Sequence, residues 1–289
     1  MTQSDFSALV ERGVVLLDGA TGSQLRAKGM PVGVSTELWI YEHPEAILAL
    51  QRAYVDAGSD IIYAPTFSAN RVGLGLHGLE DRLAELNAGL VKLSKQAAGG
   101  RALVAGDFST TGKPLEPVGT MSYQGLLDIY REQIEVVVAA GADLLGAETM
   151  LTVDECACFV EAARSVCDLP VMCTLTVEAD GHLLFGGNVV EAVETLQALG
   201  VSAVGLNCSV GPDQLEAVVA SMKAVAAVPV IAKPNAGLPV MDEQGRAHYD
   251  MMPDQFAASM RKLVDAGARI IGGCCGTGPE YIAALKGML

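Results

Sequence analysis

The repeating unit of this chain is clearest near its end, in Asp265-Ala266-Gly267-Ala268-Arg269-Ile270-Ile271-Gly272-Gly273-Cys274-Cys275-Gly276-Thr277. Gly267 marks the end of a helix, because glycine readily adopts the left-handed conformation found there. The apolar run that follows predicts a short buried strand, and the glycines after it predict the turn where the strand stops. Two other helices end in nearly the same way before a strand, at Asp56-Ala57-Gly58-Ser59-Asp60 and Ala140-Gly141-Ala142-Asp143.

Eight strand-then-helix units follow one another, at a spacing of about 30–40 residues, as a closed parallel (β/α)8 TIM barrel requires. The predicted strands cover 14–17, 60–64, 102–105, 143–147, 171–177, 203–206, 230–232 and 269–271. An irregular loop is predicted from the first strand to Pro44. The alternative is an open doubly wound sheet, but Gly19-Ala20-Thr21-Gly22 lacks the spacing of a dinucleotide fingerprint. We therefore predict a single barrel domain over residues 1–289.

The bulk composition excludes some classes of function. The chain has 289 residues, 51% of them hydrophobic and 18% charged, and a formal net charge of −15. Such an acidic chain is not expected to bind nucleic acid, which requires clustered Lys and Arg. We see neither a signal peptide nor an apolar span long enough to cross a bilayer. Without a secretory signal, the seven cysteines indicate reduced thiols, and we expect a cytoplasmic protein that does not bind membranes.

Three cysteines stand where strands are predicted to end. Cys274 and Cys275 lie between glycine pairs, and Cys208 closes the apolar run 203–206. Adjacent cysteines rarely form a disulfide without strain, but a backbone kinked at glycine lets both bind one soft metal ion. Three thiolates and one open position are typical of a catalytic zinc site. We therefore predict that the barrel gathers Cys208, Cys274 and Cys275 around Zn²⁺.

The remaining cysteines and the histidines are given structural roles. A lone cysteine is usually a small core hydrophobe, and we predict that role for Cys156, Cys158, Cys167 and Cys173. The histidines fall in predicted loops without a ligand spacing, and we predict that they lie on the surface: His43, His77, His182 and His248.

Other polar residues capable of chemistry also follow predicted strands. In parallel barrels the catalytic groups lie on the loops after the strands, at the C-terminal face. The residues at these places are Asp18, Thr66, Asp107, Glu148 and Asn235, in addition to the three cysteines. We predict that they surround one mouth, with Asn235 between Cys208 and the cysteine pair.

Taken together, these motifs resemble the homocysteine S-methyltransferase family over nearly the whole chain. The resemblance is carried by Asp18-Gly19-Ala20-Thr21-Gly22, Pro65-Thr66-Phe67, Glu148-Thr149, Gly205-Leu206-Asn207-Cys208 and Gly272-Gly273-Cys274-Cys275-Gly276-Thr277. It implies a zinc-dependent barrel that moves a methyl group onto homocysteine to make methionine. Cys208-Ser209-Val210-Gly211-Pro212 and Pro234-Asn235-Ala236-Gly237-Leu238-Pro239 are most similar to the homocysteine-binding module of cobalamin-dependent methionine synthase.

The resemblance also implies roles for single residues. By this resemblance, the zinc ligands are Cys208, Cys274 and Cys275. Asp18 and Glu148 would bind the amino group of the substrate. Backbone amides at Gly19, Ala20 and Thr21 would suit the substrate's carboxylate. Thr66 and Asn235 complete the implied substrate site, and Asn235 matches a residue that approaches the metal when substrate is absent.

The methyl donor is left open by the sequence. The folate and cobalamin modules of the full synthase are absent from these 289 residues, so methylcobalamin would have to arrive on a separate corrinoid protein. S-methylmethionine, S-adenosylmethionine or betaine would need no such partner. Two other functions also stay open: methyl transfer to another thiol such as coenzyme M, and a non-catalytic zinc-binding barrel that partners a corrinoid protein.

Overall fold

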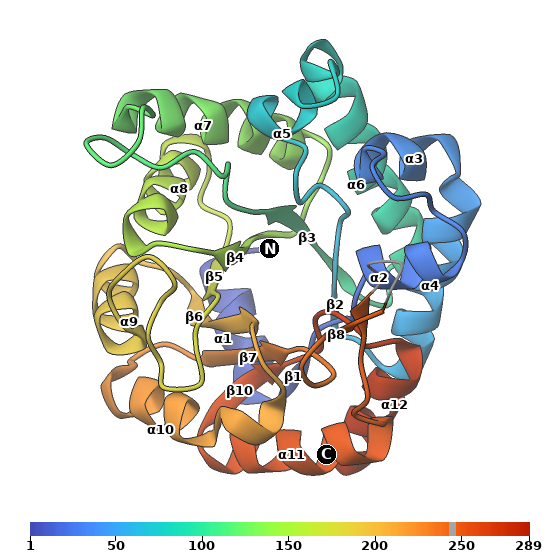
Figure 1. The fold of residues 1–289 in the computed structure, drawn as a ribbon, viewed down its shortest axis with the longest axis vertical. Coiled ribbons are helices and arrows are strands. Elements are labelled where there is room, and N and C mark those ends of the chain that lie inside the picture. The colour runs from blue at the N-terminus through green and yellow to red at the C-terminus, as the bar shows by residue number, and fades with distance from the viewer. Residues whose placement is uncertain (243–246) are drawn as a thin grey trace.

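Eight parallel strands form a ring in the computed structural model, which describes residues 1–242 and 247–289 (Figure 1). The strands are β1 (Val15–Leu16), β2 (Ile61–Tyr63), β3 (Leu103–Phe108), β4 (Leu144–Met150), β5 (Val171–Leu175), β6 (Ala203–Cys208), β7 (Val230–Pro234) and β10 (Ala268–Ile271). Their order around the sheet is β1-β10-β7-β6-β5-β4-β3-β2, with every pair parallel. The predicted (β/α)8 barrel is therefore confirmed, and the open doubly wound sheet is excluded.

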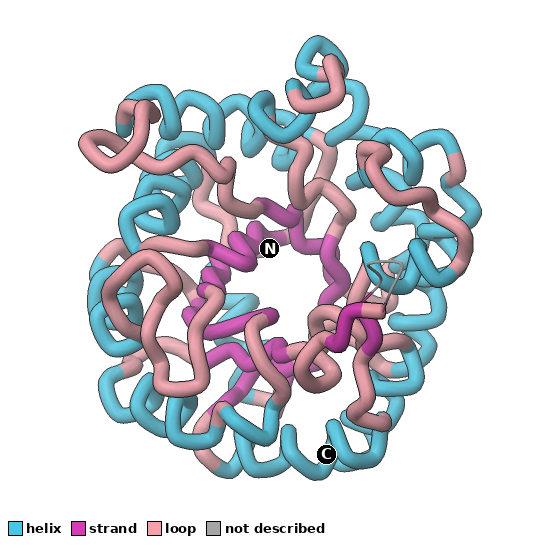
Figure 2. Tube along the Cα trace, viewed as in Figure 1, coloured by secondary structure: helices cyan, strands magenta, loops and turns pink. Residues whose placement is uncertain are grey.

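Helices surround the strand ring on the outside, as the cyan tubes of Figure 2 show. The outer helices are α4 (Pro44–Ala57), α6 (Leu83–Ala98), α7 (Tyr123–Ala139), α8 (Val153–Val166), α9 (Val189–Ala198), α10 (Glu216–Val225), α11 (Pro253–Asp265) and α12 (Pro279–Met288). The glycines predicted to end helices have the left-handed conformation: the φ values of Gly58, Gly141 and Gly267 are 111°, 97° and 120°. Among the described residues, no helix combines the length and the apolarity that a membrane span requires.

The predicted irregular loop before Pro44 was wrong, because it contains two short helices. These are α2 (Gly22–Ala27) and α3 (Thr36–Glu42). The second begins at Ser35, whose hydroxyl accepts a hydrogen bond from the backbone N–H of Leu38 at 3.3 Å. A serine N-cap of this kind satisfies an amide that the first helical turn leaves unpaired. Among the described residues, three further short helical segments lie in the connections after strands, namely α5 (Arg71–Gly75) and the 3-10 turns Glu80–Arg82 and Pro212–Gln214.

The ring closes between β1 and β2 through side chains as well as backbone. The N–H of Asp60 donates to the Leu16 carbonyl at 2.8 Å, and the Asp60 carboxylate accepts from the Leu16 N–H at 2.8 Å. One step further along, the Asp18 carboxylate accepts from the Tyr63 N–H at 2.8 Å. Each carboxylate therefore takes the place of a carbonyl that a regular strand pair would supply.

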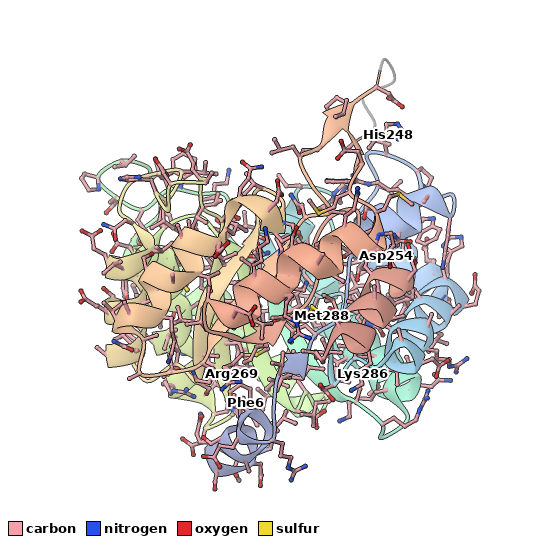
Figure 3. The ribbon with its side chains drawn as sticks, turned by 90° about the horizontal axis from the view of Figure 1, so that it is seen from below. Phe6, His248, Asp254, Arg269, Lys286 and Met288 are labelled. Carbon is pink, nitrogen blue, oxygen red and sulfur yellow. The ribbon has the colours of Figure 1, made fainter. Side chains whose placement is uncertain are left out.

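The barrel interior is filled by a separate apolar cluster and is closed at one end by a helix. The inward-facing members are Val15, Leu17, Ile61, Tyr63, Ala105, Leu144, Met172, Ala203, Ile231 and Ile270, with Phe6 packed among them. Phe6 belongs to α1 (Gln3–Glu11) and is 1% exposed. Figure 3 shows α1 at the opposite end from the hairpin of β8 (Val240–Met241) and β9 (Ala247–His248). The C-terminal ends of the strands, where barrel enzymes have their active sites, are therefore at the end away from Phe6.

Replacing Phe6 by alanine is expected to lower the free energy of unfolding by about 3–5 kcal/mol, because a fully buried ring leaves a cavity at the barrel floor. Urea denaturation measures the change. Phe185, which is 70% exposed in the connection after β5, gives the matched control, and Phe185→Ala is expected to change stability by less than about 0.5 kcal/mol. Equal losses in the two variants would contradict the assigned role of Phe6.

Candidate metal centre and acceptor site

A layer of buried polar side chains lies directly above the apolar barrel interior. Side chains two residues apart on a strand point to the same face. On β3 and β7, the next inward positions after Ala105 and Ile231 are Asp107 and Lys233. On β4, Glu148 follows Leu144 and Gly146 on the inward face. On β6, Asn207 follows Ala203 and Gly205 in the same way. All four are less than 10% exposed. The polar layer therefore forms the floor of the mouth.

The structure brings the three candidate zinc ligands together at this floor. Cys208 is the last residue of β6, and Cys274 and Cys275 follow β10. Their sulfur atoms all lie within 4.8 Å of one another. Cys274 is buried, whereas Cys208 and Cys275 are half-buried. The chain thus offers three soft donors side by side, with partial access from the mouth.

The turn that carries Cys208 has an uncommon backbone conformation. Cys208 and Ser209 have φ values of 59° and 65°, which cost non-glycine residues about 1–3 kcal/mol each. The Ser209 hydroxyl accepts a hydrogen bond from the Val177 N–H at 2.8 Å and thereby holds the turn. Strained conformations of this kind persist only where neighbouring contacts fix them.

Asn235 joins the turn after β6 to the turn after β10. Its side-chain amide donates to the Ser209 carbonyl at 3.0 Å, and its side-chain oxygen accepts from the Cys275 N–H at 3.0 Å. The residue lies between Cys208 and the cysteine pair, at the position that the sequence predicted. Its contacts here are to backbone groups, so in this structure it fixes the distance between the two ligand-bearing turns.

A second bridge between strand ends comes from Asn207. This residue belongs to the motif around Cys208, but the sequence alone indicated no role for it. Its side-chain oxygen accepts from the Thr149 N–H at 2.7 Å, and its amide donates to the Thr149 hydroxyl at 2.8 Å. The same amide lies 3.8 Å from the Cys274 sulfur. Thr149 is another non-glycine residue with positive φ, at 58°. Asn207 therefore holds the end of β4 against the cysteine cluster.

The three thiols share protons through hydrogen bonds. Hydrogen bonds from Cys208 and Cys274, with a contribution from Tyr249, lower the pKa of Cys275 to about 3. The same contacts, with Cys274 first, raise the pKa of Cys208 far above its ordinary value. The two neighbouring thiols therefore favour loss of the proton from Cys275. Because metal binding requires thiolates, this arrangement favours a cation over an uncharged ligand.

Buried charges lie beside the cysteine cluster, and Lys233 is at their centre. Its Nζ lies 2.9 Å from Oε2 of Glu148 and 3.9 Å from Oδ1 of Asp18. It also lies 4.7 Å from the centre of the Tyr63 ring. Gly146 makes room for that ring, since a Cβ on Gly146 would stand 2.5 Å from it. Sequence reasoning missed Lys233, although its spacing of two from the inward-facing Ile231 was a usable signal.

Burial and charge act in opposite directions on this group. Burial lowers the pKa of Lys233, but Glu148 and Asp18 more than offset it and hold that pKa well above its ordinary value. Burial is also the main reason that the pKa of Asp18 is raised to about 7, against the opposing effect of Lys233. The lysine therefore stays charged, while Asp18 titrates near neutral pH.

Thr66 and the Ala20 N–H, both predicted to contact the substrate, already form hydrogen bonds within the protein. The Thr66 hydroxyl is fully buried, donating to the Asp107 carbonyl at 2.8 Å and accepting from the Asp107 N–H at 3.1 Å. In this structure Thr66 therefore fixes Asp107. The Ala20 N–H donates to the Thr277 carbonyl at 3.1 Å, so one of the three amides predicted for the carboxylate is already bonded.

The structural roles predicted for the other cysteines and the histidines agree with their burial. Cys156, Cys158 and Cys173 are fully buried in the outer core, and Cys167 is partly buried against it. The four histidines are exposed on the surface. Among the described residues, the only group of three or more metal-binding side chains is the cluster of Cys208, Cys274 and Cys275.

Comparison with known proteins gives the family. Residues 15–289 match the family model described as Homocysteine S-methyltransferase. The chain belongs to the homocysteine S-methyltransferase family. The family match and the similar proteins together support an S-methyltransferase that acts on homocysteine.

The proteins similar to this chain include chains of about the same length and much longer ones. The solved homocysteine methyltransferase MmuM from Escherichia coli, in its metallated form, superposes with a TM-score of 0.83 at 25% identity, covering 98% of this chain and 99% of its own. Methionine synthase from Mycobacterium tuberculosis is 29% identical over 96% of this chain but only 25% of its own length. That from Mycobacterium leprae is 28% identical, and this chain covers 24% of it. The chain thus spans about a quarter of these curated relatives.

Asn235→Ala is expected to lower the affinity for added zinc about 10- to 100-fold, because it releases both ligand-bearing turns from each other. Competition with a chromophoric chelator measures the affinity. The control is Asn188→Ala, which removes the N-cap of α9, leaves the two hydrogen bonds of Asn235 in place and costs about 1 kcal/mol of stability. It should leave zinc affinity unchanged. Equal zinc affinities in wild type and Asn235→Ala would contradict the bridging role.

Asp18 should make stability fall as the pH rises from about 4 to about 7. The pKa of Asp18 is about 7 in the folded protein and near its ordinary value of 3.8 when unfolded. In this window the folded state keeps a proton that the unfolded state has released, so raising the pH favours unfolding. Asp18→Asn keeps an acceptor for the Tyr63 N–H but does not titrate.

Relative to Asp18→Asn, the wild type is therefore expected to lose on the order of 1–4 kcal/mol across the window. Urea denaturation at several pH values measures the difference. Asp168→Asn, in the exposed turn before β5, should follow the wild-type curve. Parallel curves for wild type and Asp18→Asn would show that the carboxylate is already ionised at low pH.

Proposed function

We propose that this chain uses zinc, held by Cys208, Cys274 and Cys275, to transfer a methyl group to the thiol of homocysteine, and that the donor is a methylated corrinoid on a separate protein. The observation that carries the proposal is the placement of three sulfur atoms within 4.8 Å of one another beside a buried group of carboxylates. The first feature suits a metal that binds thiols. The second suits an acceptor that carries an ammonium group.

The donor set fits zinc in number, type and spacing. Tetrahedral zinc with Zn–S bonds of about 2.3 Å separates its sulfur ligands by about 3.8 Å. Sulfur atoms within 4.8 Å of one another need only small side-chain movements to reach that spacing. Three cysteines leave one position of four open, which is the composition of a catalytic rather than a structural site. When bound, zinc supplies a coordination position at which an incoming thiol loses its proton and remains a nucleophile.

The protein's own residues orient the acceptor. A free alkyl thiol has a pKa of about 8.5, so little thiolate exists at neutral pH without help. Asp18 and Glu148 are placed to bind the acceptor's ammonium, and the amides of Gly19 and Thr21 to bind its carboxylate. These contacts would hold the thiol over the cysteine cluster and so convert a collision into a positioned reaction. The product is a neutral thioether, which binds soft cations less strongly than a thiolate and can leave.

The surface around the mouth supports a donor that arrives on another protein. Large apolar side chains are exposed in the connections that follow β1, β2, β3, β5 and β7, all of which lie at the C-terminal face. They are Val32, Val34, Leu76, Val118, Leu184, Phe185, Leu238, Val240, Met241 and Met252. Exposed apolar residues at this face suit contact with another protein. Small donors such as S-methylmethionine, S-adenosylmethionine or betaine would not need this rim.

The proposal is tested by incubating zinc-loaded protein and homocysteine with methylcobalamin, S-methylmethionine, S-adenosylmethionine or betaine in parallel. Methionine is measured by mass spectrometry. We expect methylcobalamin to be the best donor, and we expect Cys208→Ala to lose zinc and at least about 10³-fold of the rate, since the metal activates the nucleophile. Cys158→Ala makes the same change in the buried face of α8 and should retain zinc and activity.

Two outcomes would require different revisions. Full activity in metal-free protein, verified by elemental analysis, would sink the zinc mechanism. Faster turnover with a small donor than with methylcobalamin would keep the zinc mechanism but remove the corrinoid donor. Circular dichroism of each variant shows whether the barrel remains folded.

A further inference from the structure

The buried carboxylate group at the floor of the mouth has three members, not the two that the family motifs indicate. The third is Asp107, which follows Ala105 on the inward face of β3. Asp107 is 5% exposed. Its Oδ1 atom and Oδ1 of Asp18 are both buried without a hydrogen-bond partner among the residues that the structure describes. Buried carboxylate oxygens normally have partners, so these two call for a ligand that donates hydrogen bonds.

Lys233 compensates only one of the three carboxylates. Its ammonium bonds to Oε2 of Glu148 at 2.9 Å and lies 3.9 Å from Oδ1 of Asp18, beyond hydrogen-bonding distance. If all three were ionised, three carboxylates and one lysine would leave an excess of negative charge in a buried site. Burial, followed by the charge of Glu148, accordingly raises the pKa of Asp107 well above its ordinary value. A second cation would relieve that cost.

We propose that Asp107 is a third acceptor for the ammonium group of the acceptor amino acid, and that Lys233 is the fixed counter-ion that allows a third carboxylate to be buried there. This inference rests on the proposed function, in which the acceptor is homocysteine. An alkylammonium group donates three hydrogen bonds. Oδ1 of Asp18 and Oδ1 of Asp107 are two unpartnered acceptors at the floor of the mouth, and side-chain movements on ligand binding would be needed to bring them and the Oε1 oxygen of Glu148 around one ammonium.

This arrangement predicts selectivity for thiols that carry an ammonium group. Such a thiol pairs with the two unpartnered oxygens, whereas a thiol without the ammonium leaves them buried and unpaired. Sites built to bond a polar group discriminate strongly against ligands that lack it, because the site's own groups are then unsatisfied. Lys233 cannot supply the missing bonds to both oxygens while its ammonium stays on Glu148. Asp107 is therefore a specificity-determining residue rather than part of the metal centre.

The test compares two ligands by isothermal titration calorimetry of zinc-loaded protein. L-homocysteine carries the ammonium group, and 4-mercaptobutanoate is the same molecule without it. Asp107→Asn is expected to weaken homocysteine binding about 10- to 100-fold, the loss typical of one hydrogen bond to a charged group. It should leave 4-mercaptobutanoate within about threefold, because no contact to that ligand is lost. Asp250→Asn, an exposed acidic residue near the mouth, is the matched control.

Lys233→Met is expected to change the ratio of the two affinities in the direction opposite to Asp107→Asn. Without the lysine, the site has more unpaired negative charge, so the ratio of homocysteine affinity to 4-mercaptobutanoate affinity should rise, whereas Asp107→Asn lowers it. Zinc content and melting temperature are measured for each variant. If Asp107→Asn does not fold, the direction of the change in Lys233→Met decides the matter.

Three results are decisive against these ideas. An unchanged affinity ratio in either folded variant would overturn the roles of Asp107 and Lys233 but leave the proposed function intact. Equal losses for both ligands in Asp107→Asn would show a general disturbance of the site and would also overturn the inference. A wild-type protein that binds neither thiol would overturn the proposed function itself, and this inference with it.

Discussion

The backbone of Pro234, at the end of β7, is the reference point on which the site depends. Cys208 is paired with it in the strand register on one side, and the Cys274 N–H donates to its carbonyl at 2.7 Å on the other. The sulfur donors come from segments more than sixty residues apart, and no local motif could gather them. Strand register fixes backbone positions far more tightly than a loop does. The gathering of the three cysteines is thus an outcome of barrel closure.

Above this backbone frame, backbone strain and several buried charges occur together. Thr149, Cys208 and Ser209 are the described non-glycine residues with positive φ, and all three border the cysteine cluster. The polar layer holds three ionisable groups at low exposure, Asp107, Glu148 and Lys233. Strain and buried charge are tolerated where surrounding contacts fix them and where a ligand benefits from the fixed geometry. Their gathering at one mouth marks that mouth as the functional part of the molecule.

The sequence could predict the barrel because its evidence is repeated, with buried strands separated by helices that end in glycine. The cysteines were found because they stand beside glycines at strand ends, where residue type and position agree. Lys233 and the role of Asp107 were harder to predict. Which face a residue occupies depends on the parity of a strand only a few residues long, and an error of one position reverses it. The short helices α2 and α3 were missed because a single cap, such as Ser35, is a weaker signal than a long apolar period.

Phe6 closes one end of the barrel, so ligands can enter and leave only at the other end. Because α1 seals the floor, anything that reacts at the cysteine cluster must come and go through the same opening. A small acceptor that lies deep in the mouth is covered by whatever sits on the rim above it. If the donor is the corrinoid protein proposed above, the acceptor has to load before that donor docks, and its product has to wait until the donor departs. The closed floor at Phe6 would then impose an order of binding.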